Sequence, residues 1–131
     1  MANAQATLVF ETDLPIPFTV ANATAIEKGD LLKLSDLMTA QITGAANDLF
    51  CGIAAEEKIA NDGRVKIGVY RRGIFKVEVG TGNCTVGKDG VISAKNELID
   101  YTTLDGEKGE RFGKFLETGT DGETVLFELG A

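Results

Sequence analysis

Glycine places the tightest limit on how this chain can fold. The sequence has 16 glycines, and none of them precedes Gly29. From there on they recur at short intervals and often follow Asp, as at Asp62-Gly63, Asp89-Gly90 and Asp121-Gly122. Asp-Gly pairs favour tight turns, because glycine adopts positive φ freely and Asp hydrogen-bonds the neighbouring backbone. Many short strands separated by such turns predict an all-β fold, a small antiparallel β-barrel or sandwich.

The segments between these turns have the β-branched or alternating composition of strands. The predicted strands are Thr7–Glu11, Leu31–Leu34, Met38–Thr43, Phe50–Ala55, Arg64–Tyr70, Ile74–Val79, Gly90–Ser93, Leu98–Thr102, Phe112–Glu117 and Thr124–Leu129. Apolar and polar residues alternate most clearly in 64–70 and 74–79, a period that places one face of a strand on a core. The short connection Arg71-Arg72-Gly73 predicts that these two strands form a hairpin.

The first 25 residues differ in character from the rest of the chain. They contain both prolines, Pro15 and Pro17, but no glycine, lysine or arginine. Each proline fixes its own φ and biases the preceding residue towards an extended conformation. We therefore divide the chain into an extended N-terminal arm, residues 1–25, and a β-barrel domain, residues 26–131.

Apolar residues of the arm form the candidate contact site. Those that fall on one parity of the extended chain are Leu8, Phe10, Leu14, Ile16 and Phe18. Because an apolar face is driven to leave water, the arm either covers the open end of its own barrel or crosses onto a neighbouring subunit. Arg71 and Arg72 are a second candidate contact, since arginine is enriched at interfaces. The alternative for this pair is an exposed hairpin tip.

The sequence offers little to build a catalytic or cofactor site. It has no histidine, the most common general base and metal ligand, and no glycine-rich phosphate-binding motif. We expect no catalytic residues, no metal site, no cofactor and no small-molecule substrate, so the chain is not expected to be an enzyme. Cys51 and Cys84 are interpreted as buried thiols, with a disulfide left open. The acidic loops 105–110 and 121–123 are interpreted as solvated turns, with weak calcium binding as the alternative.

Charge and hydropathy exclude two further classes of partner. The formal net charge is −7, and an acidic protein is repelled by the phosphates on which nucleic-acid affinity depends. No apolar stretch has the length of a transmembrane helix. The N-terminal residues have no basic segment followed by an apolar block, so we expect no secretory signal and assembly in a cytoplasm.

The order of motifs in the glycine-rich part resembles a known family. A Lys28-Gly29-Asp30 turn leads into a strand, and Phe50-Cys51-Gly52-Ile53-Ala54-Ala55 follows. The next motifs are Val65–Val69, Gly73–Val77, a second turn at Val86–Val91, and Arg111–Glu117 before Gly122–Leu129. From Ile26 to Leu129 this pattern is similar to the capsid decoration, or cement, proteins of tailed bacteriophages, which are small β-barrel head-stabilising proteins.

The resemblance implies a function that the residues alone do not. A member of this family binds the outside of an assembled phage head and holds neighbouring capsomers against internal pressure, commonly as a homotrimer. The resemblance therefore implies the major capsid protein as partner and the exterior of the virion as location. The arm could add a strand to a coat-protein sheet.

Two other functions remain open at this point. A phage tail-tube or other virion structural subunit would also be β-rich and acidic, but it would form rings or fibres on its own. A carbohydrate-binding module is the weaker alternative, since the chain has no tryptophan and only two tyrosines, Tyr70 and Tyr101, to stack against sugars.

Overall fold

The described part of the chain folds into β-strands and connecting loops. The computed structural model describes residues 5–43, 50–100 and 111–130. The strands are β1 (Thr7–Phe10), β2 (Ile16–Thr19), β3 (Leu31–Asp36), β4 (Thr39–Ile42), β5 (Phe50–Ala54), β6 (Lys66–Tyr70), β7 (Gly73–Val79), β8 (Asp89–Ala94), β9 (Glu97–Asp100), β10 (Arg111–Phe115) and β11 (Thr124–Leu129). The predicted all-β class is confirmed, and every predicted strand coincides with an observed one within the described residues.

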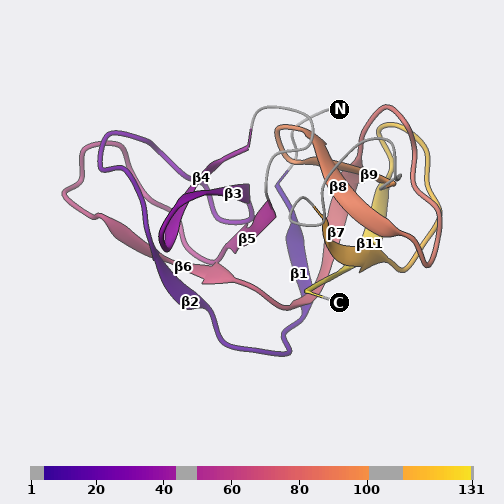
Figure 1. Ribbon diagram of the computed structural model, residues 1–131, viewed down its shortest axis with the longest axis horizontal. Helices are drawn as coiled ribbons and strands as arrows, with labels where there is room; N and C mark the ends of the chain where they lie inside the picture. The colour runs from indigo at the N-terminus through magenta and orange to yellow at the C-terminus, as the bar shows by residue number, and fades with distance from the viewer. Residues whose placement is uncertain (1–4, 44–49, 101–110, 131) are drawn as a thin grey trace.

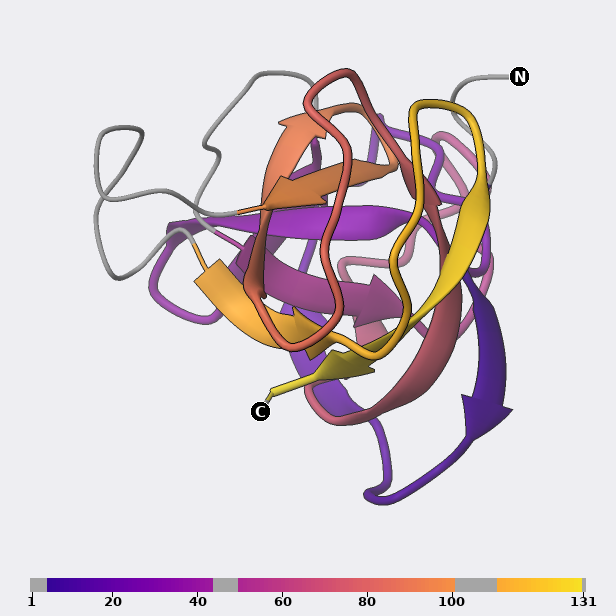
Figure 2. The same ribbon diagram turned by 90° about the vertical axis from the view of Figure 1, so that its right-hand side faces the viewer.

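The strands close into two barrels that lie side by side in Figure 1, and in Figure 2 the second barrel lies in front of the first. The first barrel has the order β2-β4-β3-β5-β6, with β6 returning to pair with β2. In the second, the order β7-β11-β10-β8-β9 is closed by a parallel pairing of β9 with β7. Strand β1 adds to the edge of β7. The sequence therefore predicted the barrel but not that there would be two.

The two barrels share one pairing scheme. In each, the first strand pairs parallel with the third and antiparallel with the fifth. In each, the fourth strand pairs antiparallel with the second and the fifth. An isolated bridge also joins equivalent loops, Ile26↔Lys58 in the first barrel and Cys84↔Gly119 in the second. The chain is thus a structural repeat in which β2–β6 correspond to β7–β11.

A glycine at the centre of the fourth strand has the same role in both barrels. A Cβ on Gly52 would lie 2.3 Å from the carbonyl oxygen of Tyr70, and one on Gly113 would lie 2.4 Å from that of Glu128. These distances are far inside van der Waals contact, so only glycine lets the fourth strand approach the fifth so closely. The equivalence extends from the topology to individual residues.

Each barrel encloses an apolar core. The first core contains Phe18, Val20, Ile26, Leu32, Ala40, Cys51, Ala54, Ile67 and Val69. The second contains Ala6, Phe75, Val77, Val79, Cys84, Ile92, Leu98, Phe115, Val125, Phe127 and Leu129, together with Leu31, Phe50 and Ile53 from the first barrel. Because the second cluster draws residues from both barrels, the two barrels are joined by shared apolar burial.

The joint between the barrels combines aromatic packing with one buried polar turn. Phe50 stacks on Phe127 with ring centroids 6.3 Å apart. The turn between β8 and β9 carries Asn96, which is buried and has a φ of 59°. Its side-chain oxygen accepts a hydrogen bond from the Leu31 amide at 2.8 Å, and its Nδ2 donates to Asp30 at 3.1 Å. Asparagine tolerates this left-handed backbone better than most residues, which places its amide group inside the joint.

The predicted hairpin between 64–70 and 74–79 is wrong. Both strands exist, but β6 pairs with β2 and β5 in the first barrel, whereas β7 pairs with β1, β9 and β11 in the second. Residues 71–73 therefore carry the chain from one barrel to the other. Each of the two strands pairs with strands distant in sequence. The length of the connection between them does not reveal such pairings.

The sequence predicts that residues 1–25 form an arm separate from a barrel of residues 26–131, and the structure places the two N-terminal strands differently. Strands β1 and β2 of this segment are extended, as expected, and residues 22–24 form a turn, but β2 is a member of the first barrel and β1 of the second sheet. Residues 1–4 lie outside the described part of the chain. The described part of the segment thus belongs to the framework of both barrels.

No helix in the described part of the chain is long and apolar enough to cross a membrane.

Candidate interaction surface

The predicted contact residues gather where the two barrels meet. The connection between β1 and β2 and the crossing from β6 to β7 both run along the lower side of the molecule in Figure 1. Arg72 joins them, since its Nε lies 3.5 Å from Asp13 Oδ2. We call the surface formed by Phe10, Leu14, Ile16, Arg71 and Arg72 the waist surface.

Apolar side chains dominate the waist surface. Phe10 is 62% exposed, Leu14 77% and Ile16 43%. Large apolar residues that are exposed together, with charged residues such as Asp13 and Arg72 at their border, are typical of a protein-binding surface.

The other two predicted contact residues face inward. Phe18 is only 2% exposed and belongs to the first core, with the Arg71 guanidinium carbon 5.6 Å from its ring centroid. Leu8 is half-buried against the second core. Both side chains therefore cover the chain's own cores and do not reach towards a neighbour. Strand pairing with β6 and β7 turns them inward.

Polar contacts hold the waist surface in place. Glu11 accepts a hydrogen bond from the Tyr70 hydroxyl; burial, then this bond and the carboxylate charge, raise the pKa of Tyr70. Together with the pair between Arg72 and Asp13, this bond fixes the β1–β2 connection at two points. A surface held in one conformation loses less entropy on binding.

Proline limits how β2 can contact a partner. The Thr19 amide donates to Met38 O on the β4 side, whereas the Val20 amide donates to Val65 O on the β6 side. Since backbone groups alternate between the two edges of a strand, Pro17 shares with Thr19 the edge that faces β4, where the strand pairing is limited to Thr19 and Thr39. Proline has no amide hydrogen to donate there. The waist surface is therefore built to bind through side chains rather than by adding a strand along β2.

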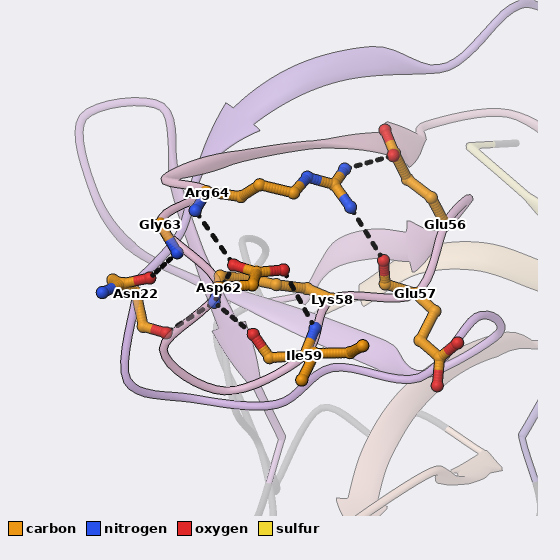
Figure 3. Close-up of polar contacts among 8 residues, drawn as sticks. All are labelled: Asn22, Glu56, Glu57, Lys58, Ile59, Asp62, Gly63 and Arg64. Atoms are coloured by element: carbon orange, nitrogen blue, oxygen red, sulfur yellow. Dashed lines mark hydrogen bonds and ion pairs between the residues drawn. The ribbon is translucent and has the colours of Figure 1, made fainter.

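A second polar cluster, shown in Figure 3, holds the loops at one end of the first barrel. Lys58 is 1% exposed, and nothing in the sequence pointed to it. Its ammonium group donates to the carbonyl oxygens of Asn22 and Ile59 and lies 3.2 Å from the Asp62 carboxylate. The Arg64 amide, Lys58 and the Ile59 amide all bond Asp62 and lower its pKa, against a smaller effect of burial.

The carboxylate of Glu56 extends this cluster to the strand β6. It accepts a hydrogen bond from the Gly68 amide at 2.7 Å and pairs with Arg64. The Gly68 bond is the main cause that lowers its pKa. In the second barrel, Glu117 accepts from the Leu126 amide at 2.8 Å in the equivalent place. These contacts join the β2–β3 and β5–β6 loops to each other and to strand β6, so the cluster stabilises this end of the barrel.

Replacing Lys58 by methionine is expected to lower the free energy of unfolding by about 1–3 kcal/mol, since it leaves buried acceptors of Asn22 and Ile59 without their donor. Urea denaturation measures this loss. Lys66→Met is the matched control, because Lys66 is exposed on β6 of the same barrel and such changes usually stay within about 0.5 kcal/mol. Equal effects of the two substitutions would show that the ammonium group of Lys58 stabilises nothing.

The remaining candidates for chemistry are also accounted for. Cys51 and Cys84 are buried, free thiols in the cores of different barrels. Burial raises the pKa of each to about 11, and a thiol of such pKa is a poor nucleophile at neutral pH. No group of three or more Cys, Asp or Glu side chains in the described ranges could hold a metal ion. The acidic loop 105–110 lies outside those ranges.

Asp121 and Glu123, the acids of the 121–123 loop, bond to groups near their own turn. Asp121 accepts from the Thr81 hydroxyl at 3.1 Å, and Glu123 from the Thr120 amide at 2.8 Å. The loop thus has the hydrogen bonding of an ordinary solvated turn.

Fold and surface together define the class: a tandem β-barrel protein with an exposed apolar surface at the joint. Comparison with solved structures gives a particular similarity. The chain is similar to the N base of the head fiber gp8.5 of bacteriophage phi29, with a TM-score of 0.57 and 15% sequence identity, over 87% of this chain and 92% of that chain. At this identity the likeness establishes the fold alone. The sequence matches no protein-family model and no curated protein.

Proposed function

We propose that this chain is a structural protein of a phage virion that binds the outer surface of the head and holds neighbouring capsomers together. The observation that carries the proposal is the shared fold with the base of a phage head fiber, over nearly the whole of both chains. That protein is named as part of a head, which favours a head protein over the tail-tube alternative. Cementing is the finer part of the proposal and agrees with the resemblance to decoration proteins.

The waist surface is the proposed site of head contact. Phe10, at the end of β1, and Leu14, in the β1–β2 connection, are the most exposed apolar residues of the waist surface. Burying one large apolar side chain contributes about 1.5–3 kcal/mol, so the two together could supply much of an interface. The proposed partner is the major capsid protein, with the chain acting as a homotrimer on the capsid exterior after assembly in the host cytoplasm. The proposal includes no catalysis, cofactor, nucleic acid, membrane or small-molecule substrate.

Co-sedimentation with phage heads tests the proposal. Expanded heads of the phage that encodes the chain, prepared without this protein, are mixed with increasing amounts of it. Binding is expected to saturate at a fixed number of copies per head. The double substitution Phe10→Ser with Leu14→Ser is expected to weaken binding about 100-fold or more, from the loss of two apolar contacts.

Ile59→Ser is the matched control for this experiment. Ile59 is 67% exposed but belongs to the loop between β5 and β6, in the polar cluster of Figure 3, and is not part of the waist surface. Its replacement is expected to leave head binding unchanged. No binding by the unmodified chain, or its assembly into tubes without heads, would overturn the proposal and favour a tail component.

A further inference from the structure

The contact between the two barrels uses one face of the second barrel. That face consists of the turn between β8 and β9, with Asn96 at its second position, and the end of the barrel at Phe75 and Phe127. It packs on the side of the first barrel that contains Asp30, just before β3 begins, and Ile53, near the end of β5. One barrel thus uses its turn and end to contact the side of the other.

The structural repeat identifies the same face on the first barrel. Met38 corresponds to Asn96, since each is the second residue of the turn between the second and third strands and each has positive φ, 47° and 59°. Ile16 corresponds to Phe75, because they pair with the equivalent residues Val69 and Phe127.

This equivalent face is open and apolar. Leu37 is 86% exposed, Met38 46% and Ile16 43%. The hydrogen bond from the Thr19 amide to Met38 O, at 2.7 Å, holds the turn beside the end of β2, and Ile16 begins the same strand. Nothing within the described ranges covers these side chains. A turn with two large apolar residues in water is costly unless it is buried elsewhere.

The side of the second barrel that corresponds to the contacted side of the first is also open. Lys88 takes the place of Asp30, and Lys114 takes the place of Ile53. Both lysines are exposed, and the Phe115 amide bond to Lys88 O, at 2.9 Å, brings them together. Val86, which is 56% exposed, lies beside them. This side therefore combines positive charge with apolar surface.

We propose that these two open surfaces bind each other in different copies of the chain. The Leu37–Met38 turn of one copy would pack on the Lys88 and Lys114 side of the next, repeating the barrel contact that already exists within each chain. Asp36 precedes the turn and is exposed, and its negative charge is opposite to that of the two lysines. Such a head-to-tail contact forms a closed ring when the rotation between copies closes. The inference rests on the self-association included in the proposed function and names the surface responsible.

The mass of the purified full chain in solution, measured by sedimentation over a range of concentrations without heads, tests the inference. The unmodified chain is expected to form one discrete oligomer. Leu37→Glu is expected to weaken association by about 10- to 100-fold, the effect of one lost apolar contact. Ile59→Glu is the control, since it adds the same charge to an exposed residue outside the surface. Circular dichroism of both variants verifies that they are folded.

Charge reversal separates a direct contact from a general effect of charge. Asp36→Lys and Lys88→Glu are each expected to weaken association, whereas the double variant is expected to restore it. A chain that is monomeric at all concentrations would overturn the inference, as would an oligomer that Leu37→Glu leaves intact. A Leu37→Glu chain that keeps its oligomer but loses head binding would assign the face to a capsid protein instead. Head binding by a monomer would refute the inference and the homotrimer, and would leave the head-binding part of the proposed function standing.

Discussion

Deletion of residues 1–20 is expected to abolish the cooperative folding of the first barrel. The deletion removes β2, which closes that barrel by pairing with β4 and β6. It also removes Phe18 and Val20, each 2% exposed in the first core, whose burial is worth about 1.5–3 kcal/mol apiece. Because small domains are stable by only about 5–15 kcal/mol, the loss of a strand together with these contacts is enough to unfold the barrel.

Circular dichroism and thermal denaturation of the truncated chain measure this outcome. The matched control keeps every backbone strand and changes only the waist surface, through Phe10→Ser with Leu14→Ser. It is expected to unfold at nearly the same temperature as the unmodified chain, because both residues are exposed. A truncated chain that melts as sharply as the control would instead show that the N-terminal segment is an accessory arm with no structural role.

The fate of this segment shows what the sequence can and cannot predict. Period-two alternation is a local signal, so it correctly located strands such as 66–70 and 73–79. Which strands pair is decided by packing over long distances in sequence. The prolines in residues 14–18 led to the prediction of a separate arm. Pro17 instead lies on the edge of β2 that faces β4, where only Thr19 is paired, so a missing amide hydrogen breaks no strand pairing. Phe10, Leu14 and Ile16 are exposed, whereas Phe18 and Leu8 face the cores, and parity alone could not separate the two groups.

The repeat was similarly hidden in the sequence. Gly52 and Gly113 each lie in the middle of a strand, but Gly52 is flanked by Cys51 and Ile53 and Gly113 by Phe112 and Lys114, and few other residues are shared between the two halves. The buried contacts of Lys58 and Asn96 gave still less signal, since a lysine or asparagine in a loop is usually solvated. These side chains are buried because loops distant in sequence meet around them.

Gly113→Ala is expected to be among the most destabilising single substitutions in this chain. The added methyl group would lie 2.4 Å from both the Glu128 carbonyl oxygen and a ring carbon of Phe127. Neither neighbour can move freely, because the carbonyl belongs to β11 and Phe127 is fully buried between Phe50 and Phe115. Overpacking of this kind costs about 1–3 kcal/mol and sometimes more. Since the same ring forms the joint, both barrels should be affected.

Gly87→Ala separates this steric effect from the effect of backbone conformation. Gly87 has a φ of 86°, but a Cβ there would meet no atom within 4 Å. Its substitution is expected to cost only about 1–2 kcal/mol, from the left-handed backbone alone. Gly52→Ala, with its Cβ 2.3 Å from the Tyr70 carbonyl oxygen, is expected to follow Gly113→Ala, because the two glycines occupy equivalent places in the repeat. Urea denaturation orders the three variants. If Gly87→Ala were the most destabilising, backbone strain would outweigh the close approach of strands, and the argument for a shared glycine role would fail.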